Sequence, residues 1–397
     1  MMRMRTAVVL WVLSAVICVE SANSVSLVND ANREFSFSLY RKLAAHADSQ
    51  GQNILFSPIC VSTALAALSV GAQGRTLRQI FNGLGFSNSL TQKDVNQAFK
   101  TLLQGANNPF QGDSSEGTAV YLDNRFRPKR EFLQTLKQSY YADGFNVDFT
   151  KAEQSAETIN EYVEEKTNGK IDQLVENLDP STVMYLISYI YYKGTWATRF
   201  DPNLTEQDHF HVDDDTQVPV LMMNMEASFR TYRDLKLKTT ILQLPFTGSY
   251  SMLLMMPDDM ATLEDDISQD LVSKWLKARM ETKPRRQNVY IPKFSIKTSY
   301  NLNDVLSEMG MTDMFSDRAN FRGISEVRGL LVSEVLHQAT LDVDETGADA
   351  AAVSAARPEL TSIGAPVLKF NRPFMVIIIE FNTEKILFMG KIIDPTL

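Results

Sequence analysis

The sequence has few of the residues and motifs on which most enzymes and metal proteins depend. Among 397 residues there are only two cysteines and four histidines. It contains no Gly-x-Ser-x-Gly elbow, His-Glu-x-x-His motif or Walker-type phosphate loop, and the nearest approach, residues 71–76, lacks the lysine and the spacing. We therefore expect a protein that is not an enzyme and that needs no cofactor.

Metal-ligating patterns are equally sparse. His209 and His211 precede Asp213, Asp214 and Asp215, but two imidazoles without a third partner are more typical of a solvated strand end. Residues 342–347 imitate the first half of a calcium loop, yet Val353 occupies the position where a bidentate glutamate is required. The sequence predicts no metal site.

The chain also lacks internal boundaries and any excess of positive charge. No linker rich in Pro, Gly or Ser, long charge run or internal repeat interrupts residues 30–393, so we expect one continuous domain. With 44% hydrophobic and 22% charged residues the chain can build a large core. Its net charge of −9 gives no global attraction to nucleic acid or to an anionic membrane, and we expect neither as a partner.

The N-terminus has the pattern of a secretory signal peptide. Arg3 and Arg5 precede an apolar run over residues 7–18, and small residues suit cleavage after Ser21. That run is shorter than the roughly 20 residues of a membrane-spanning helix. We predict a signal at residues 1–21, a domain over residues 22–397 and a secreted, extracellular protein.

Two further expectations follow from secretion and removal of the signal peptide. Cys60 becomes the only cysteine, and its apolar helical surroundings favour a buried structural thiol over a nucleophile. The single Asn-x-Ser/Thr sequon predicts glycosylation of Asn203 on an exposed loop.

Hydrophobic periodicity predicts a mixed α and β protein. Helical spacing predicts helices at residues 32–46, 58–69, 76–84, 92–103, 130–141 and 152–169. β-branched and aromatic runs predict strands at residues 184–192, 239–244, 252–256, 289–296, 335–343, 374–381 and 386–393. The last two runs are almost entirely apolar, so we expect an interior hairpin.

A long connection without a secondary-structure pattern follows the strand at 335–343. It begins at Asp344, contains Ala350, Ala351 and Ala352, and extends to Pro366. Connections of this length in compact domains are usually functional or disordered. We therefore expect the function to depend on this loop.

Five short motifs, in order along the chain, resemble the serpin superfamily, nearest to its secreted antitrypsin-like clade. They are NILFSP at 53–58, NEYV at 160–163, YKGTW at 192–196, EVLH at 334–337 and FNRPF at 370–374. The resemblance implies an α+β fold of a single domain with about nine helices, three β-sheets and an exposed reactive-centre loop at about 345–366. It also implies a monomeric inhibitor that a serine protease cleaves as a suicide substrate, after which the cut loop inserts into the main sheet.

The resemblance assigns a hinge to the start of this loop. The hinge comprises Glu345, Thr346, Gly347, Ala348, Asp349, Ala350, Ala351, Ala352 and Val353. Small side chains suit a strand that must enter a packed sheet, and glycine gives the start of the hinge its freedom. Ala348 replaces the threonine or serine that is commoner at the first inward position.

The family spacing of seventeen residues from Glu345 predicts a scissile bond between Thr361 and Ser362, which suits an elastase-like protease. Slippage by one residue gives Leu360–Thr361 and a chymotrypsin-like target. Arg357 suggests a trypsin-like target, but Pro358 follows it. The stretch 362–370 is one residue longer than usual, so all three interpretations stay open.

The resemblance further implies residues that support the opening of the main sheet. They are Ser57, Asn160, Ser188, Trp196, Lys293 and His337. Ser57, Asn160 and His337 resemble a polar cluster under the sheet. At two nearby positions the sequence differs from the family: Ser188 stands where asparagine is usual, and Cys60 stands where serine is often found. Lys293 resembles the partner of Glu345 in an ion pair at the top of the sheet, with Trp196 beneath.

Two alternatives remain open. A basic cluster suggests either a heparin-like glycosaminoglycan site or a solvated face, and it comprises Lys274, Lys277, Arg279, Lys283, Arg285 and Arg286. The second functional interpretation is a non-inhibitory hormone-carrier serpin, which shares the scaffold. The sequence lacks the aromatic residue expected near 384–387 for steroid stacking.

Overall fold

The computed structural model describes residues 2–46, 51–106, 112–346 and 365–397. Within those ranges the chain forms nine α-helices and three β-sheets, as expected. The helices are α1 (Met2–Ala45), α2 (Pro58–Ser69), α3 (Gly74–Gly83), α4 (Gln92–Ala106), α5 (Arg130–Tyr140), α6 (Ala152–Lys166), α7 (Met260–Asp266), α8 (Gln269–Glu281) and α9 (Asn303–Glu308).

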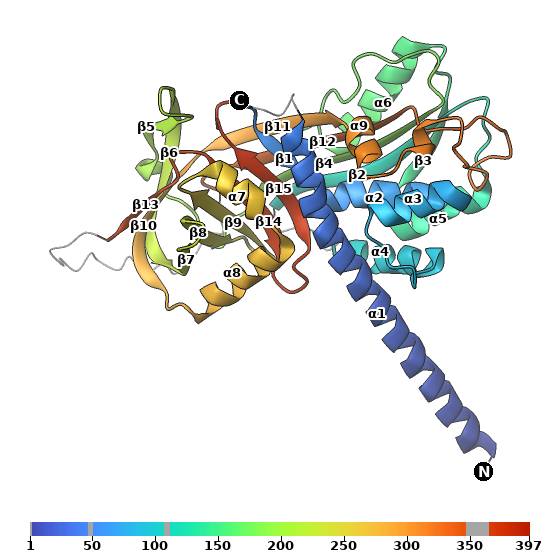
Figure 1. Ribbon diagram of the computed structural model, residues 1–397, viewed down its shortest axis with the longest axis horizontal. Coiled ribbons are helices and arrows are strands. Elements are labelled where there is room, and N and C mark those ends of the chain that lie inside the picture. Colours follow the sequence, from blue (N-terminus) through green and yellow to red (C-terminus); the bar gives the residue numbers. More distant parts are fainter. Residues whose placement is uncertain (1, 47–50, 107–111, 347–364) are drawn as a thin grey trace.

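The main sheet has five strands in the order β11-β12-β4-β2-β3 (Figure 1). Their bounds are β2 (Gly112–Asp123), β3 (Asp143–Val147), β4 (Met184–Gly194), β11 (Phe294–Asn301) and β12 (Glu334–Val343). β12 and β4 lie side by side and run parallel, from Glu334 opposite Tyr185 to Asp342 opposite Lys193. Every other pairing but β2 with β3 is antiparallel.

The second sheet has six strands in the order β1-β15-β14-β9-β8-β7. They are β1 (Ile54–Phe56), β7 (Thr231–Asp234), β8 (Thr239–Pro245), β9 (Tyr250–Pro257), β14 (Phe374–Glu380) and β15 (Ile386–Ile392). The third sheet has the order β13-β10-β6-β5, from β5 (Glu206–His211), β6 (Gln217–Phe229), β10 (Arg285–Pro292) and β13 (Val367–Lys369). The β14–β15 hairpin is interior, which confirms that prediction.

The core of the molecule surrounds α2. Every residue of this helix is buried, and it packs on β2, β4 and β15, so it joins the main sheet to the six-stranded sheet. Two residues fix where this helix begins: Pro58 stands at the first helical position, and the Ser57 side chain accepts a hydrogen bond from the Cys60 amide. The larger of two hydrophobic clusters extends from α1 to β15, and the smaller one lies on the other face of the main sheet, under α6. Both clusters pack on the same sheet, which agrees with a single domain.

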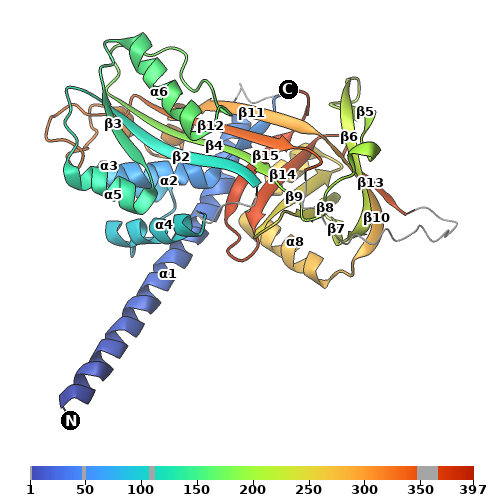
Figure 2. The ribbon, with the colours of Figure 1, turned by 180° about the vertical axis from the view of Figure 1, so that it is seen from behind.

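The two faces of the main sheet are covered by different helices, as Figure 2 shows from behind. Along β4, Tyr185, Ile187 and Tyr189 belong to the cluster that packs under α6. Leu186, Ser188 and Ile190 alternate with them and face the α2 side. Because side chains alternate across a strand, this parity decides which polar residues can meet below the sheet.

One predicted strand is wrong. Residues 289–296 are not one strand, because β10 ends at Pro292 in the four-stranded sheet and β11 begins at Phe294 in the main sheet. Between them the Lys293 amide donates to the Leu221 carbonyl. A continuous apolar pattern concealed a switch of sheet, since both halves are buried in the same way. The other predicted helices and strands are present. Their ends are displaced by a few residues, except that the helix predicted at residues 32–46 is the last part of α1, which begins at Met2.

The N-terminal residues continue α1 from Met2 without a break. From Ser24 onward the helix buries one side against the core. Cleavage after Ser21 stays a prediction. In the part of the chain that the structure describes, no helix combines the length and apolarity of a membrane span.

Candidate functional site

The loop on which the function is expected to depend connects two sheets. It leaves the end of β12 at Val343, is described as far as Thr346, and returns at Ala365 to β13, which pairs with β10. The hinge residues 347–353 and the proposed cleavage positions Leu360, Thr361 and Ser362 lie outside the described residues. What the structure describes is the anchoring of the loop at both ends.

Trp196 holds the start of the hinge against β4. Its backbone amide donates to the Thr346 carbonyl at 3.0 Å, and its indole Nε1 donates to the Asp344 carbonyl at 2.7 Å. The ring is 2% exposed and stacks on Phe246 with centroids 4.5 Å apart. The chain leaving β12 is therefore bound to a buried, fixed platform.

Two ion pairs reinforce this anchor. Lys193 Nζ lies 2.7 Å from the Asp344 carboxylate, and Lys293 Nζ lies 2.9 Å from the Glu345 carboxylate. Burial raises the pKa of Asp344, but hydrogen bonds from Lys193 and Thr346 outweigh it, so the pKa lies below its usual value. Glu345 behaves likewise, because Lys293 and Thr205 outweigh the effect of burial on its pKa. Both carboxylates are ionised at neutral pH.

The predicted glycosylation sequon adjoins the same anchor. Asn203 is exposed in a short 3₁₀ turn that begins after Asp201, and its Nδ2 donates to the Asp201 carboxylate at 2.9 Å. The sequon hydroxyl of Thr205 donates to Glu345 at 2.9 Å. An attached glycan would therefore stand beside the start of the hinge.

A buried histidine closes the seam between β12 and β4. His337 Nε2 accepts from the Ser57 amide at 2.9 Å, and its Nδ1 lies 2.9 Å from Ser188 Oγ. Because the Ser57 amide can only donate, Nε2 must be unprotonated and Nδ1 must carry the proton toward Ser188. Burial lowers the pKa of His337 to about 3, so the ring is neutral at physiological pH. One side chain thus joins β12, β4 and the start of α2.

Asn160 is not part of this cluster. It lies on α6, across the sheet, where its Oδ1 accepts from the amides of Leu174 and Val175, each at 2.9 Å. Its Nδ2 returns a hydrogen bond to the Val175 carbonyl at 2.8 Å. The residue fixes the segment after α6, so the structure brings together Ser57, Ser188 and His337 without it.

Cys60 is a free, buried thiol, as expected. Its Sγ lies 3.7 Å from the Glu116 carboxylate on β2. Burial, and then Glu116, raise the pKa of this thiol well above its usual value, which makes it a poor nucleophile. Burial also raises the pKa of Glu116. Sequence reasoning missed Glu116, because a single acidic residue in a strand carries no signal of its surroundings.

The basic cluster at α8 is smaller than expected. Lys274, Lys277, Lys283, Arg285 and Arg286 are exposed, but Arg279 is 8% exposed and belongs to the inner face of α8 with Val272 and Trp275. Its spacing of four residues from Trp275 places it there. Burial, and then Arg230, lower the pKa of Arg279. Arg286 pairs with Glu226 at 2.6 Å, which reduces the local positive charge further.

Among the described residues, no group of three or more potential ligands could hold a metal ion. His209 and His211 lie on β5, at the outer end of the four-stranded sheet.

His337 predicts a specific pH dependence of stability. Its folded pKa of about 3 lies below the roughly 6.5 of an unfolded histidine, so the unfolded chain takes up the proton first. The stabilisation is complete above pH 6.5 and is lost as the pH falls toward 3, by roughly 3 kcal/mol at pH 4. In thermal unfolding between pH 7 and 4, wild type should therefore lose more stability than His337→Asn. The surface-histidine control His209→Asn should keep the wild-type profile, and parallel profiles for all three proteins would contradict the assignment.

Comparison with known proteins agrees with this architecture. The family model described as serpin (serine protease inhibitor) matches residues 30–395. An alpha-1-antitrypsin-like protein of Tamias sibiricus is 39% identical over 367 residues, covering 91% of this chain and 87% of that protein. The hibernation-specific plasma protein HP-55 of the same species is 40% identical over the same shares. Human thyroxine-binding globulin in complex with its hormone superposes with a TM-score of 0.86 at 32% identity, covering 94% of this chain and 100% of that one. From the fold, the anchored loop and these matches together, the chain belongs to the serpin family, and it resembles the antitrypsin-like clade.

Proposed function

We propose that this serpin is a secreted inhibitor of serine proteases that acts as a suicide substrate. The observation that carries the proposal is the parallel pairing of β12 with β4. The segment after β12 must reverse direction to enter the sheet, so between these two strands it would run antiparallel to both. Antiparallel pairing is slightly more stable per residue than parallel pairing. Insertion would therefore replace one parallel contact by two antiparallel ones.

The energy of such an insertion is large compared with the contacts that oppose it. Roughly ten new backbone hydrogen bonds at about 1 kcal/mol each, together with apolar burial, give on the order of 10 kcal/mol. The opposing contacts are the hydrogen bonds around His337 and the anchor at Trp196, which must break and re-form. The balance supports a native form that is held by the intact loop and relaxes after cleavage.

The loop sequence suggests the kind of target protease, and the relatives support secretion. The bond between Thr361 and Ser362 suits an elastase-like protease, and Leu360–Thr361 suits a chymotrypsin-like one. Among the relatives, the plasma origin in the name of HP-55 supports secretion. The predicted signal at residues 1–21 and a glycan on Asn203 fit the same route, and we propose a monomer.

Two neighbouring substitutions test insertion directly. Ala350 would face into the sheet and Ala351 away from it, because side chains alternate along a strand. Ala350→Arg should convert the inhibitor into a substrate that is cleaved without forming a complex, whereas Ala351→Arg should keep most of the complex yield. The measurement is denaturing electrophoresis after incubation with neutrophil elastase, chymotrypsin and trypsin. Equal complex yields for both variants would refute insertion.

Stored strain gives a second, independent prediction. Cleavage at the loop by a protease that is not trapped should raise the melting temperature by roughly 10 °C or more, because about 10 kcal/mol is released against the unfolding entropy of a chain of this size. Differential scanning calorimetry of intact and nicked protein measures this shift. The matched control is nicked Ala350→Arg, whose rise should be smaller. An unchanged melting temperature on nicking of the wild type would contradict the proposal.

A hormone-carrier function is the second candidate, and a small pocket favours it. The pocket lies between α8 and the β14–β15 turn, lined by Leu276, Met280 and Phe381 among others. Beside it, Arg279 Nε and Gln243 Oε1 are buried and have no hydrogen-bond partner among the described residues. If the protein is a carrier, binding of thyroxine should quench the fluorescence of Trp275 on α8, and the protein should form no complex with any protease. Complex formation without quenching would exclude it.

A further inference from the structure

Three segments far apart in sequence form one end of the molecule, around α3 and the start of α5 (Figure 1). The Gln73 amide donates to the Asn320 carbonyl at 2.9 Å, and the Lys129 amide donates to the Ile324 carbonyl at 2.8 Å. Gly71 and Gly323 touch so closely that a Cβ on Gly323 would lie 2.8 Å from the Gly71 backbone. Residues 71–78, 123–131 and 313–328 are thus fixed against one another as a single surface.

This surface is strongly basic. We name it the distal basic surface, and its cations are Arg75, Arg78, Arg125, Arg127, Lys129, Arg130, Arg318, Arg322 and Arg328. The same segments carry five carboxylates, on Asp123, Glu131, Asp313, Asp317 and Glu326. The surplus of four positive charges stands out on a chain whose net charge is −9.

The carboxylates do not neutralise the outer side. Asp123 and Asp313 are buried, with 2% of each side chain exposed, and they orient arginines from below. Arg75 reaches Asp313 at 3.3 Å and Arg318 reaches it at 3.4 Å, yet 63% and 60% of these side chains stay exposed. Their remaining N–H groups are therefore available to an external anion.

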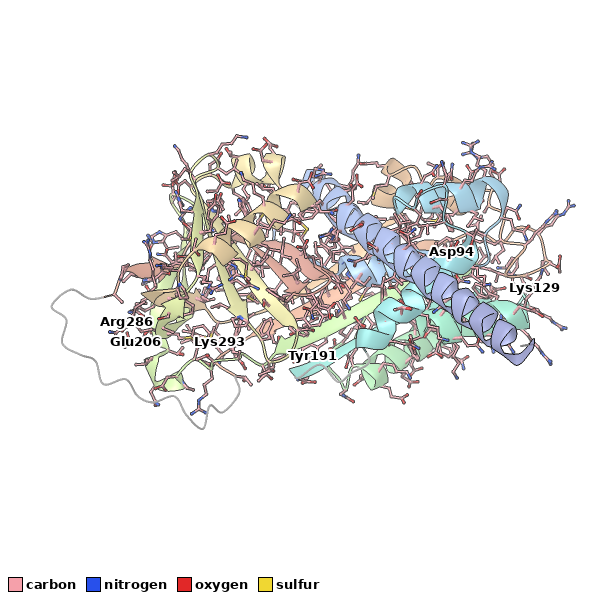
Figure 3. The ribbon with its side chains drawn as sticks, turned by 90° about the horizontal axis from the view of Figure 1, so that it is seen from below. Asp94, Lys129, Tyr191, Glu206, Arg286 and Lys293 are labelled. Carbon is pink, nitrogen blue, oxygen red and sulfur yellow. The ribbon has the colours of Figure 1, made fainter. Side chains whose placement is uncertain are left out.

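Five further arginines have no carboxylate within ion-pair distance in the described part of the chain. They are Arg78, Arg127, Arg130, Arg322 and Arg328, all exposed. Lys129 pairs with Glu326 at 2.5 Å, and Figure 3 shows Lys129 at the extreme end of the molecule. So many unpaired guanidinium groups on one fixed surface repel one another, and an anionic partner would relieve that repulsion.

We propose that the distal basic surface binds a linear sulfated polysaccharide. Guanidinium forks match the oxygen geometry of sulfate better than ammonium groups do, and eight of the nine cations are arginines. Single-stranded nucleic acid would need exposed aromatic rings for stacking, but Phe126 and Phe321 are buried. An acidic protein would need an apolar centre, and Val327 is the one exposed large hydrophobic residue on the described parts of these segments.

The position of this surface separates it from the loop. Figure 3 places Lys129 and Arg286 at opposite ends, so the distal basic surface and the α8 cluster cannot form one continuous track. The loop leaves β12 beside Lys293, which pairs with Glu345, and it returns at β13, which pairs with β10. Figure 1 shows β10 and β13 at the end of the molecule away from α3 and α5. A polysaccharide bound at the distal basic surface would tether the protein with its loop free. The proposal stands independently of protease inhibition.

Binding is tested with heparin and with a matched pair of triple variants. The distal variant is Arg127→Ala, Arg322→Ala and Arg328→Ala, and the control is Lys274→Ala, Lys277→Ala and Lys283→Ala at α8. Wild type and control should be retained on immobilised heparin at about 150 mM NaCl, whereas the distal variant should bind a heparin oligosaccharide at least about tenfold more weakly. Its slope of log K against log salt should fall by about two, because fewer counterions are released.

The outcomes are distinguishable. Circular dichroism and the melting temperature should be unchanged in both variants, since the substituted side chains lie at the surface. Desulfated heparin and single-stranded DNA should bind at least about tenfold more weakly than heparin. Elution of the wild type without retention, loss of binding in the α8 control instead of the distal variant, or equal binding of DNA would each overturn the proposal.

Discussion

The parallel contact between β12 and β4 is the constraint on which the remaining architecture depends. Two central strands of a five-stranded sheet run in the same direction, and the long loop begins where one of them ends. Parallel neighbours are slightly less stable per residue than antiparallel ones. Two of the four pairings in this sheet are parallel, and the one between β12 and β4 adjoins the start of the loop. The other features of the site either join these two strands or anchor the chain that leaves β12.

The contacts that join these two strands are few and buried. His337 joins both strands to the start of α2 through two hydrogen bonds at 2.9 Å, and burial keeps its ring neutral. Buried polar groups are costly when unsatisfied, so such a network favours one well-defined closed arrangement. At the upper end, Trp196 and the pairs Lys193–Asp344 and Lys293–Glu345 fix the chain that leaves β12. One group of residues thus joins β12 to β4, and a separate group anchors the chain that leaves β12.

Charge is distributed unevenly over the surface, although the protein as a whole is acidic. Arg279, which the α8 cluster was expected to include, is buried, and Arg286 is paired, so that cluster is weakened. The opposite end holds a larger set of arginines that converge from three segments. The α8 cluster could be recognised from the sequence because its residues are close together along the chain. The distal basic surface could not, because it forms only where three distant segments meet.

The sequence alone determined the element types, the single domain, the buried state of Cys60 and the family, because these follow from local periodicity, the absence of linkers and motifs in order. Motif resemblance also indicated that Lys293 and Glu345 would be partners. It could not separate β10 from β11, since two buried strands look alike whichever sheet they join. Nor could it assign Asn160 to the far side of the sheet, reveal Glu116 beside Cys60, or assemble the distal basic surface. Those features depend on which face a side chain takes and which distant segments touch, and only tertiary packing decides both.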